Sequence, residues 1–140
     1  MNAKVGDLMS EAVVTSEPHK SIGHVRDVME RNNVGVVPIV DSDGGLKGVV
    51  SAADLVGNVK PSSPVSTIMT DKVYTIPKYD DVSTAARVMR NHAIHHLVVT
   101  HEHRVVGVLS SFDLLRLVEG HRFVAKPAPT ASSRKGTRRS

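Results

Sequence analysis

The sequence predicts an α/β fold in which two tandem β-α-β-β-α repeats pack together with pseudo-twofold symmetry. The first observation is an internal duplication, in which residues 48–60 match residues 107–119 at six of 13 positions, whereas composition predicts about one match. Upstream, a shift of 60 positions places Val5–Met9 over Val65–Met69. The second observation is size: a repeat of about 55 residues buries too little surface to be comfortably stable alone. Packing of the two repeats, sheet against sheet, solves that problem.

The expected elements of the first repeat follow one another closely. Val13–Thr15 is a short apolar run typical of a strand. Residues 21–32 carry apolar side chains at helical spacing, and Ser21 is a suitable N-cap. Val36–Val40 and Leu46–Val50 predict two further strands, joined by a turn rich in Asp and Gly. In the second repeat, with Asp80 or Asp81 as helix cap, the corresponding elements are expected at Val73–Thr75, Asp81–His92, His96–Thr100 and Arg104–Leu109.

Each repeat ends in the same motif. Residues 48–55 and 107–114 both read Gly, two apolar residues, Ser, two variable residues, Asp and Leu. The apolar pair is typical of a buried strand end, and Ser-x-x-Asp before an apolar run is typical of a helix start. Helices are therefore expected near Ser51 and Ser110, and the second should end at Gly120. A helix N-terminus presents backbone N–H groups that suit an anion, which predicts two related anion or nucleotide sites.

The expected domain boundaries follow from the duplication and from composition. The first repeat is assigned to residues 1–60 and the second to 61–122, with the Pro- and Ser-containing stretch 57–64 as a surface connector. Residues 123–140 form a basic tail that is expected to be disordered, because it has almost no large apolar side chains. The chain has 18 basic and 14 acidic residues, and five of the basic ones lie beyond residue 125. The body is therefore near neutral, and any nucleic-acid binding is expected only through the tail.

Composition also limits the classes of site and location. The chain has no Cys, which excludes disulfides, thiolate metal sites and Cys nucleophiles. Its apolar runs are shorter than the roughly 20 residues that span a bilayer, and the N-terminal residues lack the apolar region of a signal peptide. We expect a cytoplasmic protein without membrane contact.

The doubled unit, its Gly-h-h-Ser-x-x-Asp-Leu ending, and Met-Ser or Met-Thr before each first strand resemble a cystathionine-β-synthase (CBS) domain pair, also called a Bateman module. The resemblance covers about Val5 to Val118. It implies adenosine-containing ligands, such as AMP, ADP, ATP or S-adenosylmethionine, in the cleft between the repeats. It also implies a regulatory role without catalysis, a homodimer, and a regulated partner whose identity is unknown.

The resemblance further implies roles for individual residues. Asp54 and Asp113 match the acid that holds the ribose hydroxyls. The residues expected near the ribose or first phosphate are Ser51 and Ser110, and those expected beside the adenine are Val49 and Val108. The Asp113 cleft should also include Ala12, the backbone of Val34 and Gly35, and, on the phosphate side, His95 and His96. The Asp54 cleft should also include Lys72, Tyr74 and Ile94.

The chemistry of these residue types supports a nucleotide but limits its charge. A carboxylate accepts two hydrogen bonds from a cis-diol, and an apolar slot takes the adenine face. The expected phosphate partners are Lys72, His95 and His96, in place of an Arg cluster, and His is mostly neutral at pH 7. This favours AMP or a diphosphate over tight triphosphate binding, or a pH-sensitive site. The first repeat has Gly35 and Val36 where the second has the two histidines, so the two sites should be unequal.

Three other interpretations compete with this one. The Ser-x-x-Asp motifs also fit capping boxes that bind nothing, in which case the protein would be a dimeric scaffold with vestigial clefts, acting through its helices and basic tail. His96, His101 and His103 suggest a metal site, but no carboxylate stands at a fixed spacing from them. Ser110, His95 and Asp113 suggest a catalytic triad, but Ser and Asp on one helix start leave no oriented base. The sequence therefore predicts neither a metal site nor an enzyme.

Overall fold

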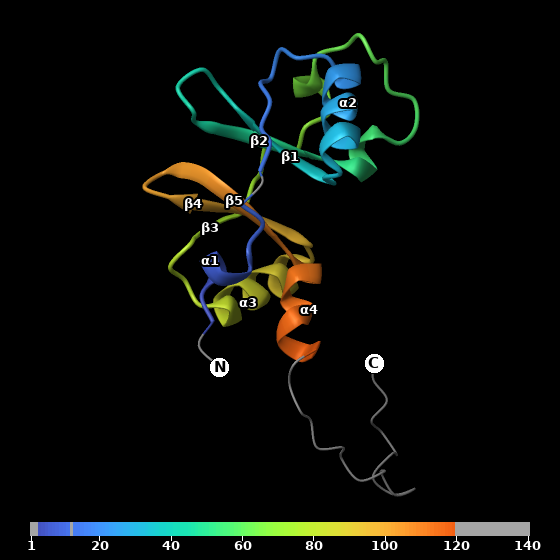
Figure 1. Ribbon diagram of the computed structural model, residues 1–140. Coiled ribbons are helices and arrows are strands. Elements are labelled where there is room, and N and C mark those ends of the chain that lie inside the picture. Colours follow the sequence, from blue (N-terminus) through green and yellow to red (C-terminus); the bar gives the residue numbers. More distant parts are fainter. Residues whose placement is uncertain (1–2, 12, 120–140) are drawn as a thin grey trace, which may run out of the picture.

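The computed structural model describes residues 3–11 and 13–119. Two antiparallel hairpins form its centre, and helices lie at its two ends (Figure 1). Each hairpin has an irregularity in its register at the equivalent place, between Ile39 and Val40 and between Val99 and Thr100. The strands are β1 (Val36–Val40) paired with β2 (Leu46–Ser51), and β3 (Thr75–Pro77), parallel to β4 (His96–His101), which pairs with β5 (Arg104–Ser110).

The helices expected after the first strands are confirmed. They are α2 (Ile22–Asn32) and α3 (Val82–His92). The Ser21 hydroxyl accepts a hydrogen bond from the backbone N–H of His24 at 3.0 Å, as expected of an N-cap. Asp81 occupies the N-cap position of α3, but its side chain makes no capping bond. The carboxylate is instead hydrogen-bonded to the ammonium group of Lys4, at 2.7 Å.

The segment that leads each repeat packs into the other half of the molecule. The short helix α1 (Val5–Leu8) contributes two side chains to the core that contains Leu97 and Leu109. The 3₁₀ turn η2 (Val65–Thr67) contributes Val65 to the core of Ile22, Ile39 and Val50. Figure 1 shows α1 beside α3 and α4, far from α2, the next helix in the sequence. Neither half therefore completes its core without a segment from the other repeat.

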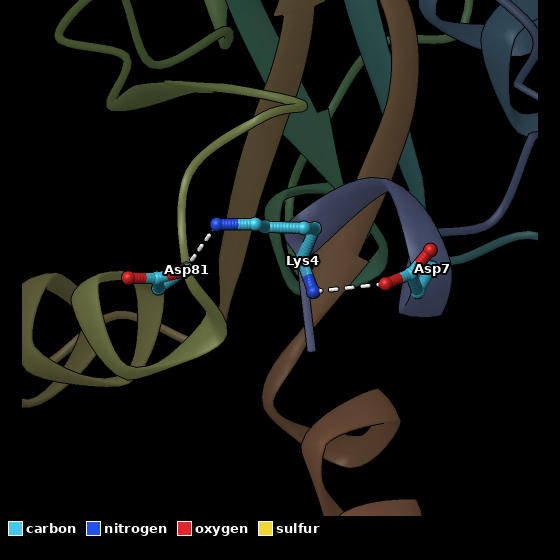
Figure 2. A network of polar contacts seen from close by, with 3 residues as sticks. All are labelled: Lys4, Asp7 and Asp81. Carbon is cyan, nitrogen blue, oxygen red and sulfur yellow. Dashed lines mark hydrogen bonds and ion pairs between the residues drawn. The ribbon is translucent and has the colours of Figure 1, made fainter. Parts of the chain in front are cut away.

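The backbone fixes these leading segments in place. The N–H of Val5 donates to the carbonyl of Asp80 at 2.8 Å, and the N–H of Val82 donates to that of Ala3 at 3.1 Å. Figure 2 shows Lys4 between two acids: its ammonium group is paired with Asp81, and its backbone N–H donates to Asp7. Asp81 raises the pKa of the Lys4 ammonium, mainly through its hydrogen bond and then through its charge. The leading segment of the second repeat is held in the same way. The N–H of Val65 donates to the carbonyl of Lys20 at 2.7 Å, and the N–H of Ile22 donates to the carbonyl of Ser63 at 2.8 Å.

The expected first strands were placed too early. The first repeat has no strand at Val13–Thr15; Ser16 forms a single parallel bridge with Ile39. In the second repeat, β3 begins at Thr75 and not at Val73. The reason is that Val13 and Val14, before Ser16, and Val73, before Thr75, line clefts between the halves and do not enter a sheet.

The helix expected at Ser51 is also shorter than predicted. It is one 3₁₀ turn, η1 (Ala52–Leu55). Gly57 follows with a φ of +100°, which turns the chain away. At the equivalent place α4 (Ser111–Glu119) continues, and its Leu114 and Leu117 pack on the adjacent core. Gly120, the expected end of α4, and the tail from residue 123 lie outside the described residues.

In the described part of the chain, no helix combines the length and the apolar character that crossing a membrane requires.

Candidate functional site

One glycine in each hairpin allows a leading segment of the chain to pass close to the hairpin backbone. At Gly107 a Cβ atom would lie 2.6 Å from the Met9 sulfur and 2.8 Å from the Ser10 carbonyl oxygen. At Gly48 it would lie 2.7 Å from the carbonyl oxygen of Thr70. Because real Cβ contacts are longer than this, both positions require Gly. This explains why the sequence pairs Gly in the final motif with Met-Ser or Met-Thr in the leading segment.

Backbone hydrogen bonds hold these crossings. Ser10 and Val108 exchange two bonds, at 2.9 and 3.2 Å, and Val49 and Thr70 exchange two bonds, both at 2.9 Å. After each crossing, the chain passes from one half to the other and lines the space between them. Two clefts result, and each has walls from both repeats.

The first cleft has a volume of about 380 Å³ and contains Asp113. Six residues expected there line it: Val34, Gly35, His96, Val108, Ser110 and Asp113. Six further residues that were not expected there also line it: Ser10, Val13, Val14, Asn33, Val36 and Phe112. Ala12, which was expected in this cleft, lies outside the described residues.

The second cleft has a volume of about 520 Å³ and contains Asp54. All the residues expected there line it: Val49, Ser51, Asp54, Lys72, Tyr74 and Ile94. The prediction was wrong for His95, which lines this cleft and not the Asp113 cleft. His95 directly precedes β4, and His96 is the first residue of that strand. His96 lines both clefts, as do Gly35 and Val36.

Each acid also caps its own helix or turn. The backbone N–H of Ser110 donates to Oδ2 of Asp113 at 2.8 Å, and the N–H of Asp113 donates to the Ser110 hydroxyl at 3.0 Å. Oδ2 of Asp54 accepts from the backbone N–H of Ser51 at 2.8 Å and from its hydroxyl at 3.1 Å. The capping interpretation is thus correct for one oxygen of each carboxylate. The acids nevertheless line clefts between the halves, which a cap alone does not require.

The histidines and Tyr74 set the electrostatics of the clefts. Burial lowers the pKa of the His96 imidazole, His95 lowers it further, and Asp113 acts in the opposite direction. His96 is therefore mostly neutral at pH 7. The Tyr74 ring stacks on His92 of α3, with 4.2 Å between ring centres, and the Lys72 ammonium lies 5.9 Å from the Tyr74 ring centre. The Lys72 ammonium and the Tyr74 ring thus lie near each other in the Asp54 cleft.

Neither alternative chemistry gains support from the described residues. Within residues 3–11 and 13–119, no group of three or more His, Asp or Glu side chains is placed to hold a metal ion. The Ser110 hydroxyl accepts a hydrogen bond from the N–H of Asp113, and His95, the base that such a triad would require, contacts the Ser111 hydroxyl at 3.5 Å.

The two sequence repeats match the CBS domain family model, at residues 5–60 and 65–120. The chain is a CBS-domain pair. Its fold is close to the crystal structure of the CBS domain pair of protein MJ0100 in complex with 5′-methylthioadenosine and S-adenosyl-L-methionine. That structure has a TM-score of 0.79 and 28% sequence identity, and the match covers 86% of this chain and 98% of the other.

This CBS pair also resembles parts of larger proteins. It is 28% identical to the cytosolic domain of the Mg²⁺ channel MgtE, solved in complex with ATP, with a TM-score of 0.73 over 81% of this chain and 48% of the other. It is 32% identical to inosine-5′-monophosphate dehydrogenase of Halobacterium salinarum over 75% of this chain. The chain spans between 22% and 40% of the length of several curated relatives that it matches. The similarity to these larger proteins therefore concerns one portion of each of them.

Proposed function

We propose that this CBS pair is a non-catalytic sensor that binds adenosine-containing ligands in the clefts between its repeats. The observation that carries the proposal is the placement of a carboxylate at a helix or turn start in each of two clefts, each walled by both repeats. Volumes of about 380 and 520 Å³ lie in the range of small-molecule sites. The MJ0100 and MgtE structures, with their adenosine ligands, support the same ligand class.

The capping bonds are compatible with this function, because a carboxylate has two oxygens. The cap occupies Oδ2 of Asp54 and of Asp113. Oδ1 of both acids, and the remaining lone pair of Oδ2 in Asp113, can accept hydrogen bonds from a ribose diol. The cap then fixes the carboxylate rotamer before the ligand arrives, which reduces the entropy lost on binding.

Among adenosine ligands, the cations favour AMP or ADP over ATP. Within the described linings of the two clefts, Lys72 is the single residue of the Lys or Arg type. A single ammonium group and partly buried imidazoles match one or two phosphates better than three. Val49 and Ile94 supply an apolar wall for the base in the Asp54 cleft.

The ligand would act by favouring one arrangement of the two halves. Since each cleft has walls from both repeats, a bound ligand stabilises the arrangement that closes around it. A regulated partner would respond to that arrangement. The enzymes among the relatives match this chain over only part of their length, and we assign the role to regulation.

We also propose that the chain forms a homodimer through α4. Phe112, Leu115 and Val118 are 77%, 53% and 51% exposed, and their spacing of three residues puts them along one side of the helix. An exposed apolar stripe of this kind is typical of an interface. The same stripe also suits the alternative function, a dimeric scaffold whose clefts are vestigial.

Calorimetric titration with AMP, ADP, ATP and S-adenosylmethionine tests the sensor. We expect at least one of them to bind with a dissociation constant below millimolar and to raise the melting temperature. The scaffold predicts no binding and no shift. A matched variant, in which Asn replaces both Asp54 and Asp113, should lose the binding while its ligand-free melting curve remains cooperative.

A further inference from the structure

The two clefts differ in the charge of their linings. The Asp54 cleft contains Lys72, His95 and His96 beside its acid. The described lining of the Asp113 cleft contains His96 beside its acid, and neither Lys nor Arg. His96 is common to both, so Lys72 accounts for the greater positive charge of the Asp54 lining, and His95 adds a further imidazole there.

The duplication shows that this difference is built into the repeats. At a shift of 60, Lys72 corresponds to Ala12, Tyr74 to Val14, and His95 to Gly35. Ala12 lies outside the described residues, but an alanine side chain carries no charge wherever it lies. The groups that would pair with a phosphate thus occur in one repeat and not in the other.

Arginines near the clefts do not remove the difference. The guanidinium of Arg116 on α4 donates to the carbonyl of Leu8. That of Arg26 on α2 donates to the carbonyl of Leu55 at 3.1 Å. Neither arginine belongs to the described lining of either ligand cleft.

The described lining of the Asp113 cleft is therefore negative at neutral pH. Burial and His95 lower the pKa of His96, so its imidazole contributes little positive charge there. A phosphate in this cleft would face the Asp113 carboxylate without a fixed cation, and like charges in a partly desolvated site repel strongly. An uncharged ligand avoids that repulsion, and a positively charged one gains attraction.

Resting on the proposed function, we propose that the two clefts select adenosine compounds by charge. The Asp54 cleft binds a 5′-phosphorylated adenosine, with Lys72 on the phosphate. The Asp113 cleft binds an adenosine compound without phosphate, whose 5′ substituent is uncharged or positively charged. The chain then responds to two classes of adenosine compound at the same time, one in each cleft.

Competition on the unaltered chain tests this directly. AMP is titrated by calorimetry into protein saturated with 5′-methylthioadenosine, and the order is then reversed. We expect each compound to bind at one per chain in the presence of the other, with its dissociation constant changed less than threefold. Mutual displacement from a single cleft would overturn the assignment while leaving the sensor intact. Failure of every adenosine compound to bind would overturn the proposed function itself, and this assignment with it.

Two substitutions then locate each compound. Lys72→Gln should weaken the binding of AMP at least tenfold and leave the binding of 5′-methylthioadenosine unchanged. Asp113→Asn should weaken the binding of 5′-methylthioadenosine at least tenfold and leave the binding of AMP unchanged. The matched control is Lys47→Gln, an exposed lysine on β2 that lies 3.7 Å from Asp41 and outside both clefts; it should change neither. Ligand-free melting curves identify any variant that is unfolded. Unchanged AMP binding in folded Lys72→Gln protein would show that the assignment is wrong.

Discussion

At the scale of single residues, the two acids combine a structural role with a proposed binding role. Each uses Oδ2 to cap its own helix or turn, and each lines a cleft between the repeats. Substitution by Asn separates the roles, because the amide oxygen can still accept the capping bond while the amide nitrogen only donates. Substitution by Ala removes both.

For Asp54→Asn we predict that AMP binds about 10 to 100-fold more weakly, the effect of losing a hydrogen bond to a charged group. Ligand-free stability should fall by less than about 1 kcal/mol, because the cap persists. In the unaltered chain, 2′-deoxy-AMP should bind more weakly than AMP. In the variant this difference should disappear, since the group that reads the hydroxyl is absent. Calorimetry with both nucleotides measures the four affinities.

The control for that series is Asp27→Asn, an exposed acid on α2 paired with Arg31 at 3.6 Å. It should alter neither affinity. A 2′-deoxy penalty of the same size in Asp54→Asn protein would mean that another group holds the ribose.

His96 gives the second residue-scale prediction. Its folded-state pKa is lowered, mainly by burial. Without ligand, His96 therefore contributes stability above its unfolded pKa of about 6.5, and this contribution is lost as the pH falls through the lower folded value. A bound phosphate would raise the pKa again. AMP affinity should thus increase as the pH is lowered from 8 to 6, more in the unaltered chain than in His96→Asn.

Adenosine serves as the control in this pH series, because it has no phosphate and should show little pH dependence in either protein. Comparison with His96→Asn also removes the titration of the nucleotide's own phosphate. Identical pH profiles for the two proteins would exclude His96 from phosphate binding.

The assignment of residues to the clefts came from the resemblance to a CBS pair. Lys72, Tyr74 and Ile94 line the cleft of Asp54 as expected. His95 was assigned to the wrong cleft, because the direction of a side chain at a strand start depends on where the strand begins. Val13 and Val73 were read as strand residues, since an apolar residue that lines a cleft has the same pattern as one that enters a sheet.

At the scale of elements, the close crossings at Gly48 and Gly107 join each hairpin to a leading segment. The hairpins and the helices at 22–32 and 82–92 could be predicted, because their spacing of apolar residues and their turns are local signals. The exchange of α1 and η2 between the halves could not. It depends on contacts between Val5 or Val65 and a core from the other repeat, which no local pattern encodes.

Gly107→Ala tests the crossing. The new methyl group would lie 2.6 Å from the Met9 sulfur and 2.8 Å from the backbone oxygen of Ser10. Met9 can move, but the backbone of Ser10 is held by Val108. We predict a loss of about 1 to 3 kcal/mol in the free energy of unfolding, the usual effect of overpacking, measured by urea denaturation.

Gly35→Ala is the matched control, because nothing lies within 4 Å of the position of its Cβ. Its free energy of unfolding should change by less than about 1 kcal/mol. Equal losses in the two variants would show that the close crossing is not what requires Gly107.

At the scale of the whole molecule, the proposed ligand and the proposed second copy would act on the same assembly. A ligand that binds only the assembled pair of repeats stabilises it by about 2.7 kcal/mol at a concentration of 100 times its dissociation constant. The exposed stripe of α4 lies on the same element that begins with the Asp113 motif. A change at the cleft can therefore reach the proposed dimer face through one short helix.

Leu115→Glu tests the dimer. A charge in the centre of the apolar stripe should convert the dimer to a monomer, because a buried unpaired carboxylate is strongly unfavourable. Light scattering after size-exclusion chromatography measures the mass. Tyr79→Glu, which alters a side chain that is 61% exposed and outside α4, should leave the mass unchanged. A monomeric mass for the unaltered chain would exclude the proposed interface.

In the proposed function, an acid at the end of each repeat holds the ribose of an adenosine compound between the two halves. A crystal structure of the chain grown with AMP and 5′-methylthioadenosine tests this. We expect ribose hydroxyls within hydrogen-bonding distance of the carboxylates of Asp54 and Asp113, with base and sugar between the repeats. Ligands bound elsewhere, or clefts filled by side chains while both acids serve only as caps, would contradict it.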